Sequence, residues 1–226
     1  MSKDLAIVTV VIGKNYERVA SVSLPTIQAY ADRIGAELIV VRARAFPGYQ
    51  FYWEKFQIAG LLEKYGRVLL LDADLVVRTT APSIFDQVPA GVFAAFEEGK
   101  YFTDRVREME KDGPFYGIMT QRPVAERGFT YFNTGVVLAD RTHRDAFELP
   151  LNPKGEPMSE QTYTNLAVAR HGFKFLDLGI RWNGLHSLRR ADNRKDLHIV
   201  HYAGLPKVTG WVERMTDQMK KDLSNV

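Results

Sequence analysis

Short apolar runs recur along the first third of this chain and alternate with segments whose apolar residues have helical spacing. Residues 5–12, 37–42 and 67–72 are rich in Val, Ile and Leu, which predicts buried β-strands. Residues 27–34 and 53–65 place apolar side chains every three or four positions, which predicts helices. This alternation predicts an α/β domain with parallel strands joined by right-handed crossovers.

The rest of the chain carries a less regular pattern. Further strands are expected at residues 92–96, 130–140, 173–178 and 197–202, and helices at 159–171 and 211–223. The polar group Asn133-Thr134-Gly135 interrupts an apolar run, which indicates close approach of a ligand to the backbone. Ser159 is the expected N-cap of its helix. Residues 99–128 are highly charged, which favours a solvated helix and loops, with a substrate lid as the alternative.

Composition adds few constraints. The chain has 226 residues, 46% of them hydrophobic and 25% charged, as in ordinary globular domains. A net charge of +3 is too small to indicate nucleic-acid binding. There are no cysteines, which excludes disulfides and zinc-thiolate sites. Residues 5–12 are too few to span a bilayer and no signal-peptide pattern precedes them, so a cytoplasmic location is expected.

The strongest candidate chemistry follows the third predicted strand, which ends in Asp72-Ala73-Asp74. Buried carboxylates are costly unless a cation or ligand meets them. Side chains two positions apart on a strand share a face, so Asp72 and Asp74 are predicted to point the same way. Two hard oxygen ligands suit Mg²⁺ or Mn²⁺ carrying a phosphate group. The alternative is that Asp72-Ala73-Asp74 is a surface turn without a functional role.

Later residues are weaker candidates when taken alone. On a strand, His198 and His201 face opposite sides, so only one of them can join a site on a given face. His201 is favoured as the site residue because a glycine-containing turn follows it. The alternative is that His201 is a histidine of the core. Glu160 and Gln161 begin a helix, where capping is the plain explanation. Lys55 lies beside aromatic residues, so the aliphatic part of its side chain could pack on them while its ammonium group stays exposed.

The order of these motifs resembles glycosyltransferase family 8, the glycogenin-like retaining enzymes, and the related bacterial galactosyltransferases. The motifs are Lys55, Asp72-Ala73-Asp74, residues 132–136 (Phe-Asn-Thr-Gly-Val), Glu160-Gln161 and residues 201–207 (His-Tyr-Ala-Gly-Leu-Pro-Lys). The resemblance covers nearly the whole chain. It implies a GT-A fold, with a single Rossmann-like mixed central sheet flanked by helices.

The resemblance also implies the roles of segments and residues. Residues 1–226 would form one domain, with a nucleotide-binding half to about residue 80 and a donor-sugar and acceptor half to about residue 210, followed by a C-terminal helix. Asp72, Asp74 and His201 would hold Mn²⁺ or Mg²⁺, and Glu160 and Gln161 would face the reacting sugar as the catalytic pair. The residues implied to contact the nucleotide-sugar are Thr9, Val10, Tyr16, Lys55, Asp72, Ala73, Asn133, Gly135, Gly204 and Lys207.

The implied activity is metal-dependent transfer of a hexose from a nucleotide-sugar, with UDP as the expected nucleotide, to an acceptor hydroxyl with retention of configuration. The acceptor would be a glycan, a lipid-linked saccharide or a protein, and no nucleic acid is involved. Two departures stand out. The family's Asp-Gln-Asp is Glu160-Gln161-Thr162 here, and its Lys-Pro-Trp is residues 207–211, with the tryptophan displaced.

Other activities fit parts of the sequence. A haloacid-dehalogenase-like phosphohydrolase would use Asp72 as its nucleophile, with Asp192 and Asp196 as the late acidic pair. A nucleotidyltransferase would need a glycine-rich first loop, whereas Gly13 stands alone. A binding module that holds nucleotide-sugar without catalysis is a third possibility. The C-terminal helix carries Lys220 and Lys221 beside apolar residues, so it either packs onto the domain or contacts a membrane surface.

Overall fold

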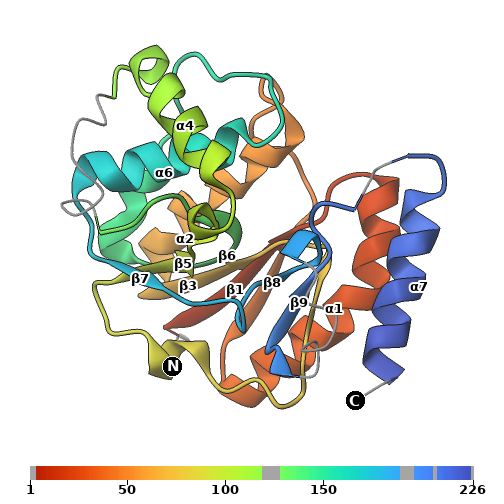
Figure 1. Cartoon of the computed structure of the whole chain (residues 1–226). Coiled ribbons are helices and arrows are strands. Elements are labelled where there is room, and N and C mark those ends of the chain that lie inside the picture. The colour runs from red at the N-terminus through yellow and green to blue at the C-terminus, as the bar shows by residue number, and fades with distance from the viewer. Residues whose placement is uncertain (1–3, 119–127, 189–195, 206–207, 225–226) are drawn as a thin grey trace.

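A mixed six-stranded sheet forms the centre of the molecule. The computed structural model describes residues 4–118, 128–188, 196–205 and 208–224, and it places helices on both sides of this sheet (Figure 1). The strand order is β2-β1-β3-β6-β5-β7, with bounds β1 Leu5–Val10, β2 Glu37–Val41, β3 Arg67–Leu71, β5 Phe93–Phe96, β6 Asn133–Asp140 and β7 Phe175–Asp177. Strands β1, β2 and β3 are parallel, as predicted, and β6 runs antiparallel to both β3 and β5.

A small second sheet lies beside the first. It has the order β4-β9-β8, with bounds Leu75–Val77, Ile199–His201 and Gly184–Leu185. The sequence pattern predicts β9, which lies within the longer predicted strand 197–202. It predicts neither β4 nor β8, which are too short to show a period on their own. The chain passes from the first sheet to the second through Asp72-Ala73-Asp74, which lie between β3 and β4.

The helices largely follow the predicted pattern. Their bounds are α1 Lys14–Ile34, α2 Ile58–Lys64, α3 Ile84–Gln87, α4 Thr103–Asp112, α6 Ser159–His171 and α7 Trp211–Ser224, and 3₁₀ turns include η1 Phe51–Gln57, η2 Glu98–Lys100, η3 Pro114–Tyr116, η4 Arg141–Phe147 and η5 His186–Leu188. Gly35 ends α1 with a φ of 71°, a left-handed conformation that glycine adopts easily. The Ser159 prediction is wrong: Met158 is the N-cap, and the Ser159 hydroxyl donates to the Lys154 carbonyl instead.

Strand β3 is buried on both faces, which explains its unbroken apolar sequence. Val68 and Leu70 pack into the cluster beneath α2 and α6, whereas Leu69 and Leu71 pack toward α1. Burying each such side chain contributes about 1.5–3 kcal/mol relative to exposure. This burial fixes the position at which the strand ends, and therefore the position of Asp72.

The C-terminal helix packs onto the domain, one of the two alternatives that its sequence left open. Val212, Met215 and Met219 of α7 share an apolar cluster with Val19 of α1 and with the second sheet, and α1 and α7 run side by side in Figure 1. No helix in the described part of the chain combines the length and the apolar character that crossing a bilayer requires.

One buried histidine should make the fold sensitive to acid. His143 is 1% exposed and its Nδ1 accepts a hydrogen bond from the Asp140 amide. Burial lowers the pKa of His143 below 6.5, although the nearby Asp140 charge opposes this effect. At a pH below the pKa of His143 in the unfolded chain, His143 therefore binds a proton more readily in the unfolded chain than in the folded one, which favours unfolding.

We expect the free energy of unfolding to fall as the pH drops from about 7.5 to about 5.5, a range that brackets the ordinary histidine pKa. In His143→Gln, whose amide oxygen can still accept from Asp140, that decline should be smaller. Urea unfolding at both pH values measures the difference. Equal declines in the two proteins would show that His143 is not responsible.

Candidate functional site

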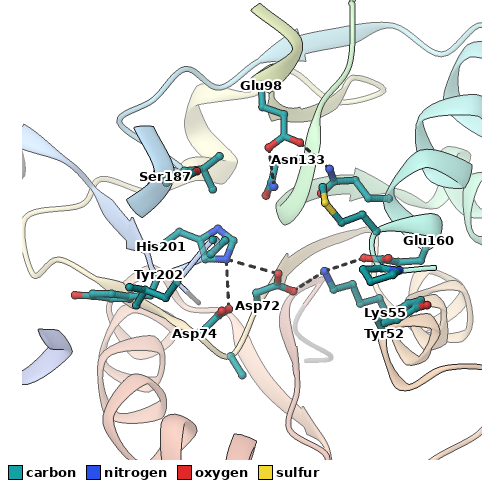
Figure 2. Close-up of a pocket in the computed structure, with 18 of the residues that line it drawn as sticks. Tyr52, Lys55, Asp72, Asp74, Glu98, Asn133, Glu160, Ser187, His201 and Tyr202 are labelled. Carbon is teal, nitrogen blue, oxygen red and sulfur yellow. Dashed lines mark hydrogen bonds and ion pairs between the residues drawn. The ribbon is translucent and has the colours of Figure 1, made fainter. Parts of the chain in front are cut away.

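A cavity of about 520 Å³ opens at the edge of the central sheet (Figure 2). Val10 ends β1, Asp72 follows β3 and His201 ends β9, and all three line it. Because β6 runs antiparallel to β3, its first residue, Asn133, meets the same edge. Ligands of open α/β sheets bind at the carboxyl ends of parallel strands, and this volume is typical of small-molecule sites.

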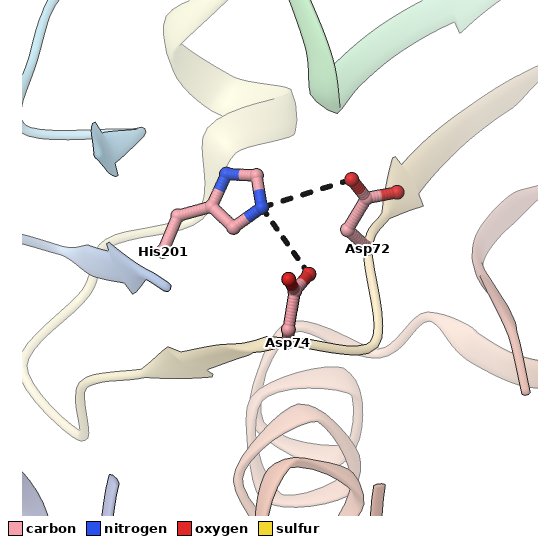
Figure 3. Close-up of side chains that lie close together, drawn as sticks. All are labelled: Asp72, Asp74 and His201. Carbon is pink, nitrogen blue, oxygen red and sulfur yellow. Dashed lines mark ion pairs between the residues drawn. The ribbon is translucent and has the colours of Figure 1, made fainter. Parts of the chain in front are cut away.

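Asp72, Asp74 and His201 converge inside this cavity (Figure 3). The His201 Nε2 atom lies 3.3 Å from Asp74 Oδ1 and 3.7 Å from Asp72 Oδ2. One ligand atom from each residue falls within a mutual distance of 4.8 Å. The structure therefore brings together the three residues implied as metal ligands.

Backbone contacts hold these three side chains in place. The Asp72 amide donates to the Gly135 carbonyl at 2.8 Å, and the Tyr202 amide donates to the Asp74 carbonyl at 2.8 Å. Leu75 of β4 pairs with His201 of β9. Asp72 and Asp74 therefore face the same space, although they lie in the connection between β3 and β4 and not within one strand, as the periodicity argument assumed.

The donor set fits a divalent cation. His201 Nε2 is buried and has no hydrogen-bond partner among the described residues, and an unsatisfied nitrogen in that position is costly unless something binds it. The two carboxylates are the hard oxygen ligands that Mn²⁺ and Mg²⁺ prefer, and the imidazole adds a nitrogen ligand of the kind that transition metals bind. The site therefore suits the metal that the resemblance implies.

Lys55 and Glu160 form a buried pair next to the cluster of Asp72, Asp74 and His201. Lys55 Nζ lies 2.7 Å from Asp72 Oδ1, 3.6 Å from Glu160 Oε1 and 3.5 Å from Thr134 Oγ1. Burial opposes the charge on Lys55, but Asp72 and Glu160 outweigh it and raise the pKa of the ammonium. The alternative of an exposed ammonium head is wrong, since the side chain of Lys55 is 14% exposed.

Burial raises the pKa of the Glu160 carboxyl, and the Lys55 charge opposes this shift. The backbone amides of Gln161 and of Glu160 itself also lower that pKa. The Oε2 atom of Glu160 is buried without a hydrogen-bond partner in the described structure. Because Glu160 also lines the cavity, this oxygen can accept a bond from a bound ligand.

Gln161, Asn133 and Glu98 form a polar wall on the other side of the cavity. Glu98 Oε1 accepts from Gln161 Nε2 at 2.7 Å, and Glu98 Oε2 accepts from Asn133 Nδ2 at 3.0 Å. The Thr134 amide donates to Gln161 Oε1 at 3.0 Å, which fixes the orientation of that side-chain amide. Burial raises the pKa of the Glu98 carboxyl, while Asn133, Arg105 and Gln161 oppose the shift. No sequence motif marks Glu98, which lies in a charged stretch of the chain.

The implied nucleotide-sugar contacts fall into three groups. Most line the cavity, namely Val10, Tyr16, Lys55, Asp72, Ala73, Asn133 and Gly204. Thr9 and Gly135 are not among the described residues that line it: Thr9 is fully buried and points to the opposite sheet face from Val10. Gly135 instead packs against His201, since a Cβ atom there would come within 2.2 Å of His201 Cε1. Lys207 lies outside the described residues.

Aromatic side chains surround the first turn of α1. Tyr16 lies 5.3 Å from Phe51 and 5.9 Å from Trp211, measured between ring centroids. Tyr16 and Phe51 line the cavity, together with Tyr52 and Phe102. Helix α1 begins at Lys14, well before the helix that the sequence pattern predicts at residues 27–34. The role of Phe51 was missed because an aromatic residue near a predicted helix is ordinarily part of the core.

Comparison with known proteins identifies the fold. No protein-family model and no curated protein sequence matches the chain. A glycosyltransferase involved in the glycosylation of the major capsid of PBCV-1 aligns with a TM-score of 0.64 at 12% identity, over 96% of this chain and 98% of its own. The galactosyltransferase LgtC, in complex with donor and acceptor sugar analogs, aligns with a TM-score of 0.57 at 15% identity, over 96% and 95%.

The bifunctional glycosyltransferase WbbM also aligns, with a TM-score of 0.62 at 15% identity, over 100% of this chain and 50% of its own. Identities this low are evidence for the fold alone. The mixed central sheet flanked by helices is therefore the GT-A-like fold of these glycosyltransferases, in agreement with the sequence-based prediction.

Proposed function

We propose that this protein is a glycosyltransferase of the family 8 type. It transfers a hexose from a nucleotide-sugar, with UDP as the proposed nucleotide, to an acceptor hydroxyl with retention of configuration, and it requires Mn²⁺ or Mg²⁺. The observation that carries the proposal is the placement of the Asp72, Asp74 and His201 group beside the buried Lys55–Glu160 pair in one cavity of a GT-A-like fold.

The charges around the cavity support a divalent ion. Three carboxylates lie close together here, those of Asp72, Asp74 and Glu160. The positive charge of Lys55 offsets one of these three negative charges. A divalent cation would offset the other two. Without it, a donor diphosphate would enter a cavity with an excess of negative charge, which Coulomb repulsion disfavours.

Asp72, Asp74 and His201 would hold the metal, which supplies Lewis-acid stabilisation of the departing diphosphate when bound. Lys55 keeps the Asp72 carboxylate in position through its 2.7 Å contact. Its raised pKa keeps the ammonium charged, so it also adds positive charge where the leaving group develops negative charge.

The polar wall and Glu160 would bind the donor sugar. Glycosyl transfer develops positive charge on the sugar ring, and the buried carboxylate of Glu160 can stabilise that charge or act as a transient nucleophile. Gln161 is held by the Thr134 amide and by Glu98, so its position next to the sugar is fixed before the donor binds.

The aromatic residues near α1 would hold the nucleoside. Val10, Tyr16 and Phe51 offer apolar and aromatic surface on the β1 side of the cavity, and flat rings favour stacking on a planar base. This arrangement agrees with a nucleotide-binding half in the first part of the chain and a sugar-binding half in the second. The proposed acceptor is a glycan, a lipid-linked saccharide or a protein.

The test is a donor panel with purified protein. We expect release of UDP from one UDP-sugar when Mn²⁺ is present, and loss of that release when EDTA removes the metal. LgtC is a galactosyltransferase, so UDP-galactose is the first donor to try. UDP binding without turnover on any donor would favour the binding module, and hydrolysis of a generic phosphomonoester would favour the phosphohydrolase.

A further inference from the structure

A chain of buried amides leads to the histidine of the proposed metal site. Asn133 begins β6, Asn183 precedes β8 and His201 ends β9. Asn133 is 7% exposed, Asn183 is fully buried and His201 is 1% exposed. Asn183 Nδ2 donates to Asn133 Oδ1 at 3.0 Å, and Asn183 Oδ1 lies 2.8 Å from His201 Nδ1.

Backbone and carboxylate groups fix the direction of this chain. The Gly135 amide can only donate, and it donates to Asn133 Oδ1 at 2.9 Å. Asn133 Nδ2 is left to donate to Glu98 Oε2, which accepts. Asn133 Oδ1 also requires a donor from Asn183, so the nitrogen of the Asn183 amide faces Asn133 and its oxygen faces His201.

This direction determines which nitrogen of His201 carries the proton. A side-chain amide oxygen only accepts, so Nδ1 of His201 must be the N–H donor in the 2.8 Å contact. In a neutral imidazole, Nε2 then has the free lone pair. Nε2 is the atom that faces Asp72 and Asp74 and has no hydrogen-bond partner among the described residues.

We propose that Asn183 is a positioning residue that keeps His201 in the tautomer able to bind a metal. If Nε2 carried the proton instead, its N–H would donate to Asp74 and no lone pair would point into the site. Gly135 limits the ring from the other side, because a Cβ atom there would lie 2.8 Å from His201 Nδ1. The inference rests on the proposed metal-dependent function, and it adds a residue that no motif in the sequence marks.

Two variants of Asn183 separate tautomer control from simple packing. Asn183→Leu removes the acceptor for Nδ1–H, and we expect its affinity for Mn²⁺ to fall by about 10- to 100-fold. Asn183→Asp keeps an acceptor oxygen in place, so it should retain Mn²⁺ binding better than the leucine variant does. Asn152→Ala, at an exposed asparagine, is the matched control and should bind like the unmodified protein.

The measurements are Mn²⁺ titration by calorimetry and long-range ¹H–¹⁵N NMR of His201 in the metal-free proteins. We expect the proton on Nδ1 in the unmodified protein and in Asn183→Asp, and a shift of the proton toward Nε2 in Asn183→Leu. A proton on Nε2 in the unmodified protein would overturn the inference, even if the leucine variant did not fold. Equal loss of Mn²⁺ affinity in both variants with an unchanged tautomer would also overturn it, because packing alone would then explain the effect.

These results remain separate from the test of function. If the unmodified protein binds Mn²⁺ and releases UDP, but Asn183→Leu keeps both its affinity and its tautomer, only the inference about Asn183 fails. If the unmodified protein binds no Mn²⁺, the proposed function fails, while the NMR spectrum still reports the tautomer of His201.

Discussion

Replacing Asp74 by alanine is expected to reduce metal-dependent sugar transfer, or hydrolysis of the donor, on the order of 1000-fold. The variant removes the carboxylate that lies 3.3 Å from His201 Nε2 and leaves Asp72 and His201 as the remaining ligands. Metal stabilisation of the leaving group is worth several kcal/mol, and each 1.36 kcal/mol corresponds to tenfold in rate. The measurement is kcat with saturating donor and Mn²⁺.

The fold of this variant should stay intact. Asp74 faces the cavity and its carboxylate lies near that of Asp72, so its removal relieves repulsion between like charges in the metal-free protein. The thermal midpoint without metal should therefore not fall. Asp217→Ala, at an exposed position of α7, is the matched control. Undiminished turnover of Asp74→Ala in the presence of Mn²⁺ would refute the assignment.

Replacing Lys55 by methionine is expected to lower kcat by about 100- to 1000-fold, the range found when one preorganised group that stabilises a leaving charge is removed. Methionine keeps most of the apolar stem but removes the ammonium from its position between Asp72 and Glu160. Unlike Asp74→Ala, this variant should bind Mn²⁺ at least as tightly as the unmodified protein, because Asp72 loses a competing cation.

Parallel measurements of kcat and of Mn²⁺ affinity distinguish these two variants. Lys64→Met, at an exposed position of α2, controls for the loss of one positive charge. Lys55→Arg keeps the charge with a different shape, and it should recover part of the activity. An unchanged kcat in Lys55→Met would mean that Lys55 supports only the fold.

The cluster of Asp72, Asp74 and His201 was predictable because its parts leave local signals in the sequence. A buried strand that ends in Asp72-Ala73-Asp74 shows where the apolar run stops and the carboxylates begin. The strand period placed His198 and His201 on opposite faces, and the glycine-containing turn after His201 favoured it as the site residue. In the structure His198 packs on the ring of Trp182. The parallel first half of the sheet followed from the alternation of strands and helices, whereas the mixed sheet of the GT-A fold was implied by the resemblance alone.

Other parts of the site depend on contacts that no local pattern records. Glu98 lies in a 3₁₀ turn, and it meets Gln161 and Asn133 only after the sheet has formed. Asn183 is an isolated asparagine whose role arises from its contact with His201, which lies 18 residues further along the chain. Short strands such as β4 and β8 exist because of tertiary pairing and not because of sequence period.

The strand period separates two residues that the resemblance assigns to the nucleoside pocket, since neighbouring residues of a strand point to opposite faces. Val10 lines the cavity, and the side chain of Thr9 is buried on the other face of β1. A contact between Thr9 and the nucleoside stays a prediction.

Asp72, Asp74 and His201 are proposed to hold a divalent metal that meets a nucleotide diphosphate in this cavity. Anomalous X-ray diffraction from crystals grown with Mn²⁺ and UDP locates the metal and the nucleotide together. The proposal predicts a single manganese peak within bonding distance of all three side chains and of the diphosphate oxygens. UDP bound in the cavity with no manganese at these residues, or manganese bound only elsewhere, would contradict it.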